Sequence, residues 1–215
     1  MRLDKYLSDT GKLTRKEAGT AVRRGRVSVY GKCIRDPGAH IDPGADVTLD
    51  MQPIVRSEFT YVLLDKPEGV ISSTEKSDRT AMSLLPPEFA KMGMFPCGRL
   101  DRDTTGVLLV TNDGEMAHLL LSPRRHVSKT YRFTLTIPAA DDTEERFHSG
   151  IVIGEDECAP AEVSFEPDRC SGTIILTEGK FHQVKRMFAA VGTEVVSLRR
   201  IKFGPLSEDG SPGPG

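Results

Sequence analysis

The stretch Gly98-Arg99-Leu100-Asp101-Arg102-Asp103-Thr104-Thr105-Gly106 places four charged side chains directly in front of an apolar run at residues 107–111. So much charge excludes this stretch from a core, whereas the apolar run of valine and leucine that follows is typical of a buried strand. A strand buried on both faces holds the loop attached to it in one position. We therefore predict a rigid, charged loop that leads into a strand of the core.

Strand and helix patterns extend in both directions from this loop. Alternating or β-branched segments predict strands at residues 59–64, 70–72, 131–137, 162–165 and 173–177, and helical spacing of apolar residues predicts helices at 115–121, 143–147 and 181–191. The fold class predicted for this part is α+β, with a large mixed, mostly antiparallel sheet flanked by helices. The segment 207–215, which is rich in Gly, Pro and Ser, is interpreted as a poorly ordered tail.

The N-terminal segment has a separate organisation. Leu3, Tyr6 and Leu7 have the spacing of an amphipathic turn, and Thr14-Arg15-Lys16-Glu17 is a capping box that opens a second short helix, which Gly25 ends. Short strands are predicted at residues 27–29 and 47–49, and residues 52–57 are interpreted as a linker. We expect a small αα-β module and its linker over residues 1–57, followed by a second domain over 58–215.

Composition narrows the class of protein. With 215 residues, of which 38% are hydrophobic, the chain can bury a real core, so a disordered or fibrous protein is excluded. Its apolar runs are far shorter than the roughly 20 residues of a membrane-spanning helix, and the start lacks the apolar segment of a signal peptide. The four cysteines, at positions 33, 97, 158 and 170, form no Cys-x-x-Cys pair, which disfavours a metal site. We expect a cytoplasmic protein without metal or membrane contact.

Charge is distributed unevenly along the chain. The net charge is −2, yet the first 35 residues hold 10 Lys and Arg against 3 Asp and Glu. Such a cluster fits phosphate binding, although a basic helix is also commonly just a solvated face. The candidate RNA-binding residues of this segment are Arg15, Lys16, Arg23, Arg24 and Arg26.

Three segments carry side chains suited to chemistry. Arg99 and Arg102 flank Asp101, so this carboxylate is expected to stay ionised and to suit nucleophilic or base chemistry, although loop aspartates are often only turn formers. On the strand that begins near residue 129, Lys129, Tyr131 and Phe133 share one face, which places an aromatic ring among cations, as base stacking requires. Lys185 lies at the border of the buried face of the last helix, where it either extends into solvent or pairs with a carboxylate.

Taken together, these segments match a known family. Gly98-Arg99-Leu100-Asp101-x-x-Thr104-x-Gly106, Lys129-Thr130-Tyr131 and Glu178-Gly179-Lys180-x-His182-Gln183-Val184-Lys185-Arg186-Met187-Phe188 resemble the RsuA branch of the RsuA/RluA pseudouridine synthase superfamily. The N-terminal segment resembles the S4 RNA-binding module that precedes the catalytic domain in that branch. The likeness covers residues 2–206, and family members usually continue with another short segment.

The resemblance implies a role for each matching residue. It makes Asp101 the catalytic aspartate, Tyr131 the ring that stacks on the target uracil, Lys185 the basic partner of Asp101 and Arg99 the side chain that helps displace the target nucleotide. Asp103 matches no catalytic position. Lys180 and Arg186 are further candidates for RNA contacts along the cleft.

The resemblance also implies a reaction and a partner. The reaction is the cofactor-free isomerisation of uridine to pseudouridine in ribosomal RNA, free or in a ribosome-assembly particle, by a monomer. Residues 66–72 and 79–86 look more like the 16S small-subunit enzymes, with a 23S large-subunit enzyme as the alternative. Two other classes remain open: a non-catalytic RNA-binding assembly factor, and a hydrolase that uses Asp101 and Asp103 as a carboxylate pair.

Overall fold

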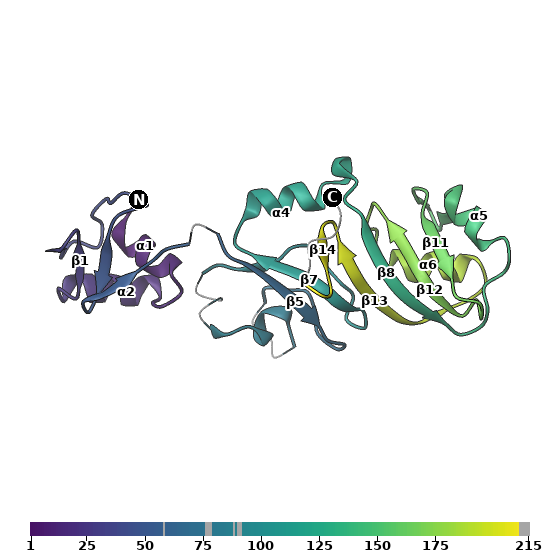
Figure 1. The fold of residues 1–215 in the computed structure, drawn as a ribbon, viewed down its shortest axis with the longest axis horizontal. Helices are drawn as coiled ribbons and strands as arrows, with labels where there is room; N and C mark the ends of the chain where they lie inside the picture. Colours follow the sequence, from purple (N-terminus) through teal and green to yellow (C-terminus); the bar gives the residue numbers. More distant parts are fainter. Residues whose placement is uncertain (58, 76–78, 88, 90–91, 211–215) are drawn as a thin grey trace. The chain divides into compact units, whose positions relative to one another are not determined.

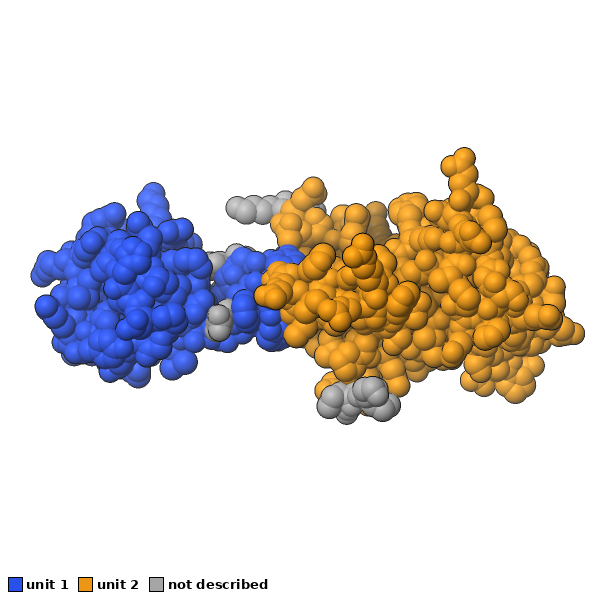
Figure 2. All heavy atoms as spheres, turned by 90° about the horizontal axis from the view of Figure 1, so that it is seen from above, with its two compact units in different colours: residues 1–61, 82–95, 111–113 blue, residues 62–81, 96–110, 114–215 orange. Residues whose placement is uncertain are grey.

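The computed structural model describes residues 1–57, 59–75, 79–87, 89 and 92–210 (Figure 1). The chain separates into two compact units, one of residues 1–61, 82–95 and 111–113 and one of residues 62–81, 96–110 and 114–215 (Figure 2). No helix in the described part of the chain is long and apolar enough to cross a membrane.

The N-terminal module has the predicted αα-β order. Helices α1 (Leu3–Asp9) and α2 (Arg15–Arg23) precede a four-stranded antiparallel sheet of order β2-β1-β3-β4, formed by β1 (Val27–Val29), β2 (Lys32–Cys33), β3 (Val47–Leu49) and β4 (Gln52–Ile54). The Thr14 capping box is present, and Gly25 follows α2 with a φ of +73°. Apolar side chains of both helices and of the sheet share one core.

The interpretation of residues 52–57 as a linker was wrong for its first half. Residues 52–54 form β4, in which Pro53 lies opposite Thr48 and Ile54 is buried against the module's core. Proline is tolerated there because β4 is the edge strand of its sheet, where one side of the backbone needs no partner.

An eight-stranded mixed sheet forms the centre of the second unit (Figure 1). Its main order is β11-β12-β8-β13-β7-β5, and all pairs along it from β11 to β13 are antiparallel, whereas β13 and β7 are parallel. The bounds are β5 (Tyr61–Lys66), β6 (Phe95–Pro96), β7 (Thr105–Thr111), β8 (Lys129–Leu135), β11 (Glu162–Phe165), β12 (Ser171–Leu176), β13 (Val195–Phe203) and β14 (Leu206–Ser207). The predicted fold class, α+β with a mostly antiparallel mixed sheet, is confirmed.

Short elements connect and cover this sheet. They are η1 (Ala81–Leu84), α4 (Gly114–Leu121), η2 (Pro123–Arg125), α5 (Thr143–His148), the hairpin of β9 (Val152–Ile153) and β10 (Asp156–Glu157), and α6 (Gln183–Ala190). The apolar face of α6 packs on the sheet, where the rings of Phe188 and Phe133 lie 4.6 Å apart. Phe147 of α5 adds a further ring at 5.2 Å from Phe188. The core of this unit therefore lies between α6, α5 and one sheet face.

The sequence reading missed strand β13, although β13 joins the antiparallel and parallel parts of the sheet. Two register shifts, between Val195 and Ser197 and between Arg200 and Lys202, interrupt its alternation of buried and exposed residues. The strand also contains Arg199, Arg200 and Lys202, and three basic residues in four positions are typical of a surface segment.

Two further expectations need correction. Residues 70–72 form no strand beyond an isolated bridge between Ile71 and Thr80. The proposed tail begins in ordered structure, because Ser207 is buried in β14 and Glu208 forms ion pairs with Arg132 and Arg199. Residues 211–215 lie outside the described residues.

The close approach of β7 to β13 depends on Gly106. A Cβ atom at this position would lie 2.2 Å from the carbonyl oxygen of Arg200, and φ is +99°. Both features exclude an ordinary side chain, since no real Cβ contact is that short and positive φ is strained in L residues. Gly106 therefore allows the charged loop and β13 to lie side by side.

We expect Gly106→Ala to lower the free energy of unfolding by at least about 3 kcal/mol, because strained φ and steric overlap act together. Gly192→Ala is the matched control: φ is +89° there, but nothing lies within 4 Å of the added Cβ. We expect the control to cost only about 1 kcal/mol. Urea denaturation of both variants measures the difference, and equal losses would mean that the close approach to Arg200 is unimportant.

Candidate active site

The charged loop predicted from the sequence is anchored from both sides. Ser72 Oγ donates to the carbonyl of Leu100 (3.1 Å) and accepts from the Leu100 amide (3.0 Å), and the Gly69 amide donates to the carbonyl of Arg102 (2.8 Å). The Thr104 amide donates to the carbonyl of Asp101 (3.1 Å) and closes a turn. The backbone of the loop that presents Asp101 is therefore held by hydrogen bonds at Leu100, Asp101 and Arg102, which supports the predicted rigidity.

A buried lysine fastens this loop, and the sequence reading did not select it. Lys66, at the end of β5, is 0% exposed, and its Nζ donates to the carbonyl oxygens of Val70 (2.7 Å), Pro67 (3.2 Å) and Arg102 (3.4 Å). Burial lowers the pKa of Lys66, while the charges of Asp103 and Asp101 act in the opposite direction. The signal in the sequence was a lysine that ends a strand and is followed directly by Pro67-Glu68-Gly69.

The basic side chains beside Asp101 come from α6 and the residue before it. Lys185 Nζ lies 3.3 Å from one carboxylate oxygen of Asp101, and His182 Nε2 lies 3.6 Å from the other. In the described part of the chain, neither Arg99 nor Arg102 forms an ion pair with Asp101, so the expected source of charge was wrong. The pairing of Lys185 with Asp101, which the resemblance implied, is present in the geometry.

Asp103 shares the same lysine. Lys185 Nζ donates a short hydrogen bond to Asp103, and this bond lowers the pKa of the Asp103 carboxyl. This hydrogen bond favours the ionised form of Asp103, whereas an acid–base carboxylate pair requires one protonated carboxyl group.

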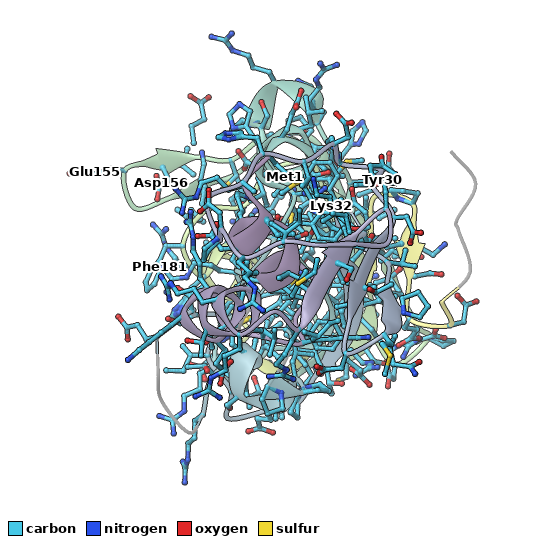
Figure 3. All side chains as sticks on the ribbon, turned by 90° about the vertical axis from the view of Figure 1, so that its left-hand side faces the viewer. Met1, Tyr30, Lys32, Glu155, Asp156 and Phe181 are labelled. Atoms are coloured by element: carbon cyan, nitrogen blue, oxygen red, sulfur yellow. The ribbon has the colours of Figure 1, made fainter. Side chains whose placement is uncertain are left out.

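The turn into α6 differs from the prediction. The helix begins at Gln183, because His182 has a left-handed φ of 49°. The buried side chain of Gln183 donates to Glu178 (2.6 Å) and accepts from the Lys180 amide (2.9 Å), which closes the turn. Phe181 is not a core residue of this helix, since it is 76% exposed and stacks on His182 with ring centroids 3.9 Å apart. Figure 3 shows Phe181 projecting outward on the side of Asp156.

A cavity of about 620 Å³ opens in front of Asp101, within the second unit. This volume falls in the range of pockets that hold a nucleotide-sized ligand. Among the predicted site residues, Arg99, Asp101, Tyr131 and Lys180 line it. Tyr131 forms part of the wall as an almost buried residue of β8, 9% exposed. Lys185 lines a smaller adjoining pocket with Asp101, Asp103 and His182.

The two residues of this region that were predicted to contact RNA, Lys180 and Arg186, are held by protein groups. Lys180 Nζ donates to the carbonyl of Glu157 and lies 3.5 Å from Glu178. Arg186 does not line the cavity: its guanidinium binds Asp156 (2.8 Å) and the carbonyl of Ile153 (2.6 Å), which fastens the β9–β10 hairpin to α6. This geometry gives Arg186 a structural contact and leaves its RNA contact a prediction.

The five predicted RNA-binding residues of the N-terminal module lie on and just beyond α2 and are all exposed. Two of them have acidic neighbours: Arg15 lies 3.7 Å from Asp4, and Arg26 forms a two-pronged pair with Asp50. Lys16, Arg23 and Arg24 form no ion pair within the described residues. Figure 3 labels Tyr30 and Lys32, which belong to the β1–β2 hairpin of the same module.

Fold and site define a class of protein. A nucleotide-sized cavity with a fixed carboxylate, a tyrosine wall and several cations, together with a separate basic module, is typical of an enzyme that modifies a base in a nucleic acid. The family model for RNA pseudouridylate synthase matches residues 60–190, and that for the S4 domain matches residues 1–47. The chain belongs to the RNA pseudouridylate synthase family.

Individual relatives agree with this assignment. The chain is 42% identical to an uncharacterised RNA pseudouridine synthase of Bacillus subtilis, over 100% of this chain and 92% of the relative. It is 39% identical to ribosomal small subunit pseudouridine synthase A of Escherichia coli, over 100% and 94%. A crystal structure of a pseudouridylate synthase superposes with a TM-score of 0.63 at 32% identity, covering 94% of this chain and 88% of the other.

The contact between Lys185 and Asp103 predicts how the pKa of the Asp103 carboxyl changes when Lys185 is replaced. In Lys185→Met the donor to Asp103 is removed, so we expect the pKa of the Asp103 carboxyl to rise toward its ordinary value. Titration of side-chain carboxyl carbons by NMR measures this pKa. Asp50, whose pKa is lowered by Arg26, is the internal control and is expected to stay unchanged. The same Asp103 pKa in both proteins would show that the contact is absent in solution.

Proposed function

We propose that this protein converts one uridine of small-subunit ribosomal RNA to pseudouridine, with Asp101 as the catalytic carboxylate. The observation that carries the proposal is the position of Asp101: it lies on a loop with fixed backbone, faces a cavity of nucleotide size and has Lys185 at 3.3 Å. The name of the Escherichia coli relative, at 39% identity over the whole chain, supports the small subunit over the large one.

The reaction needs few groups. The bond between C1′ and N1 breaks, the uracil turns, and C1′ joins C5; C5 loses a proton and N1 gains one, so atoms and electrons balance without a cofactor. Asp101 either attacks the nucleoside or removes a sugar proton, and in both routes the ammonium group of Lys185 lies 3.3 Å from the reacting carboxylate.

The remaining roles are those that the resemblance implied, and the positions of the side chains support them. Tyr131, nearly buried in the cavity wall, offers its ring to the displaced uracil, and the exposed Arg99 at the rim helps displace the nucleotide from its stack. The unit that contains the S4 match supplies phosphate contacts through exposed basic residues. We propose that the protein acts as a monomer in the cytoplasm, on ribosomal RNA or an assembly particle.

The geometry argues against the two rival classes. A hydrolase with paired carboxylates needs one protonated carboxyl group, whereas the hydrogen bond from Lys185 lowers the pKa of Asp103. A non-catalytic RNA-binding factor would have no use for a fixed aspartate, a lysine and a tyrosine around one cavity.

We expect Asp101→Asn to abolish isomerisation while RNA affinity changes less than about twofold, because a carboxylate does not attract phosphate. Asp103→Asn, the matched control on the same loop, is expected to retain most activity. Release of tritium from C5-labelled ribosomal RNA measures turnover, and filter binding measures affinity. Substantial turnover by Asp101→Asn would remove Asp101 from its role. Pseudouridine mapping in cells with and without the protein identifies the uridine and the subunit.

The N-terminal charges predict a salt effect. We expect Arg23→Gln combined with Arg24→Gln to reduce the slope of log K against log salt by about 0.7 to 0.9 for each phosphate group that the protein no longer binds, with little change in turnover at saturating RNA. These two arginines are chosen because, in the described residues, no carboxylate pairs with them. Arg146→Gln, an exposed change on α5, is the control. An unaltered slope in the double variant would make these charges a solvated face.

A further inference from the structure

A buried arginine that forms few hydrogen bonds with the protein lies in the cavity wall. Arg200 of β13 is 2% exposed, and its Nε donates to the carbonyl of Val107 (2.8 Å). Its Nη2 is buried without a hydrogen-bond partner, and no carboxylate within the described residues forms an ion pair with it. Buried guanidinium groups are normally paired, since an unpaired buried charge is costly. Within the described residues, the protein therefore supplies no anion to pair with the guanidinium group of Arg200.

A second cation lies near the first. Lys129 of β8 also lines the cavity, and its Nζ donates to the carbonyl of Val127 (2.9 Å). Burial lowers the pKa of Lys129, and the charge of Arg200 lowers it further, whereas Cys97 and Glu178 act in the opposite direction. Both cations lie over the ring of Phe203, Arg200 at 4.7 Å and Lys129 at 5.8 Å. Two mutually repelling cations held together in this way form a site for an anion.

The sheet places this pair beside the tyrosine. Arg200 lies directly opposite Tyr131 in the β13–β8 ladder, and Lys129 precedes Tyr131 by two residues, on the same face of β8. All three line the cavity that also contains Asp101. A uracil held against Tyr131 therefore has its own backbone within reach of the two cations.

We propose that Arg200 and Lys129 bind one phosphodiester group of the nucleotide that enters the cavity. The inference rests on the proposed function and adds a phosphate site to it. Uracil and ribose are neutral, so the backbone phosphate is the anion that an RNA substrate brings. Binding it inside the cavity directs backbone binding energy to the displaced nucleotide, which offsets the cost of unstacking the base.

The test uses small probes, so that it does not depend on turnover. Isothermal titration of the full chain with uridine 3′,5′-bisphosphate, uridine and inorganic phosphate measures the contribution of the nucleotide phosphates. The variants are Lys129→Gln and Arg200→Lys, which keeps the buried charge but loses the planar donor fork. Lys202→Gln, an exposed change on the same strand and outside the cavity, is the matched control. Thermal melting confirms that each variant is folded.

We expect the bisphosphate to bind wild type at least tenfold more tightly than uridine does, and each cavity variant to lose about tenfold or more in bisphosphate affinity with uridine affinity unchanged. Equal bisphosphate affinity in wild type and the folded variants would overturn the proposal. Inorganic phosphate binding as tightly as the bisphosphate would overturn it as well, because the site would then be a general anion site. Asp101→Asn keeps bisphosphate binding if the phosphate site is correct, so failure of the catalytic role of Asp101 is seen separately, in turnover.

Discussion

The second unit depends on one close contact between two backbones. At Gly106, β7 runs parallel to β13 and approaches the carbonyl of Arg200 more closely than any side chain would permit. On one side of this contact is the loop that presents Asp101, and on the other is the strand that carries Arg200 into the cavity wall. Gly106 therefore positions both the loop that carries Asp101 and the strand that forms this part of the cavity wall.

The site has one region where positive and negative side chains are paired and another where two cations have no carboxylate partner within the described residues. Asp101 and Asp103 share Lys185, so the positive and negative groups at that end of the cavity compensate one another. Arg200 and Lys129 form an excess of positive charge at another part of the wall, with no carboxylate pairing with either in the described residues. An RNA nucleotide suits this division, because it presents a neutral base and sugar to the carboxylate and a negative phosphate to the cations.

Holding the charged loop in place requires a buried lysine, and polar contacts compensate the free-energy cost of burying its charge. Lys66 is fully buried, and three carbonyl oxygens surround its ammonium group. These oxygens belong to two separate segments, residues 67–70 and the charged loop itself, so the lysine replaces the water that would otherwise solvate and loosen the loop. Gln183 has a comparable role in the turn before α6, where its amide links Glu178 to Lys180. The positions of Asp101 and Lys185 thus each rely on a buried polar side chain.

The sequence by itself determined the fold class, the capping box at Thr14, the loop before β7 and the face of β8 on which Tyr131 lies, because these depend on local periodicity and turn chemistry. Only the tertiary structure revealed β13, whose bulges and three basic residues conceal its alternation, and with it the buried Arg200. In the described residues, the Asp101 carboxylate pairs with Lys185 and lies beside His182, whereas Arg99 and Arg102 form no ion pair with it. Neighbours in sequence can point away from one another, whereas residues about 80 positions apart meet when α6 packs on the sheet. The family resemblance implied the contact of Lys185 with Asp101, but local periodicity alone does not encode it.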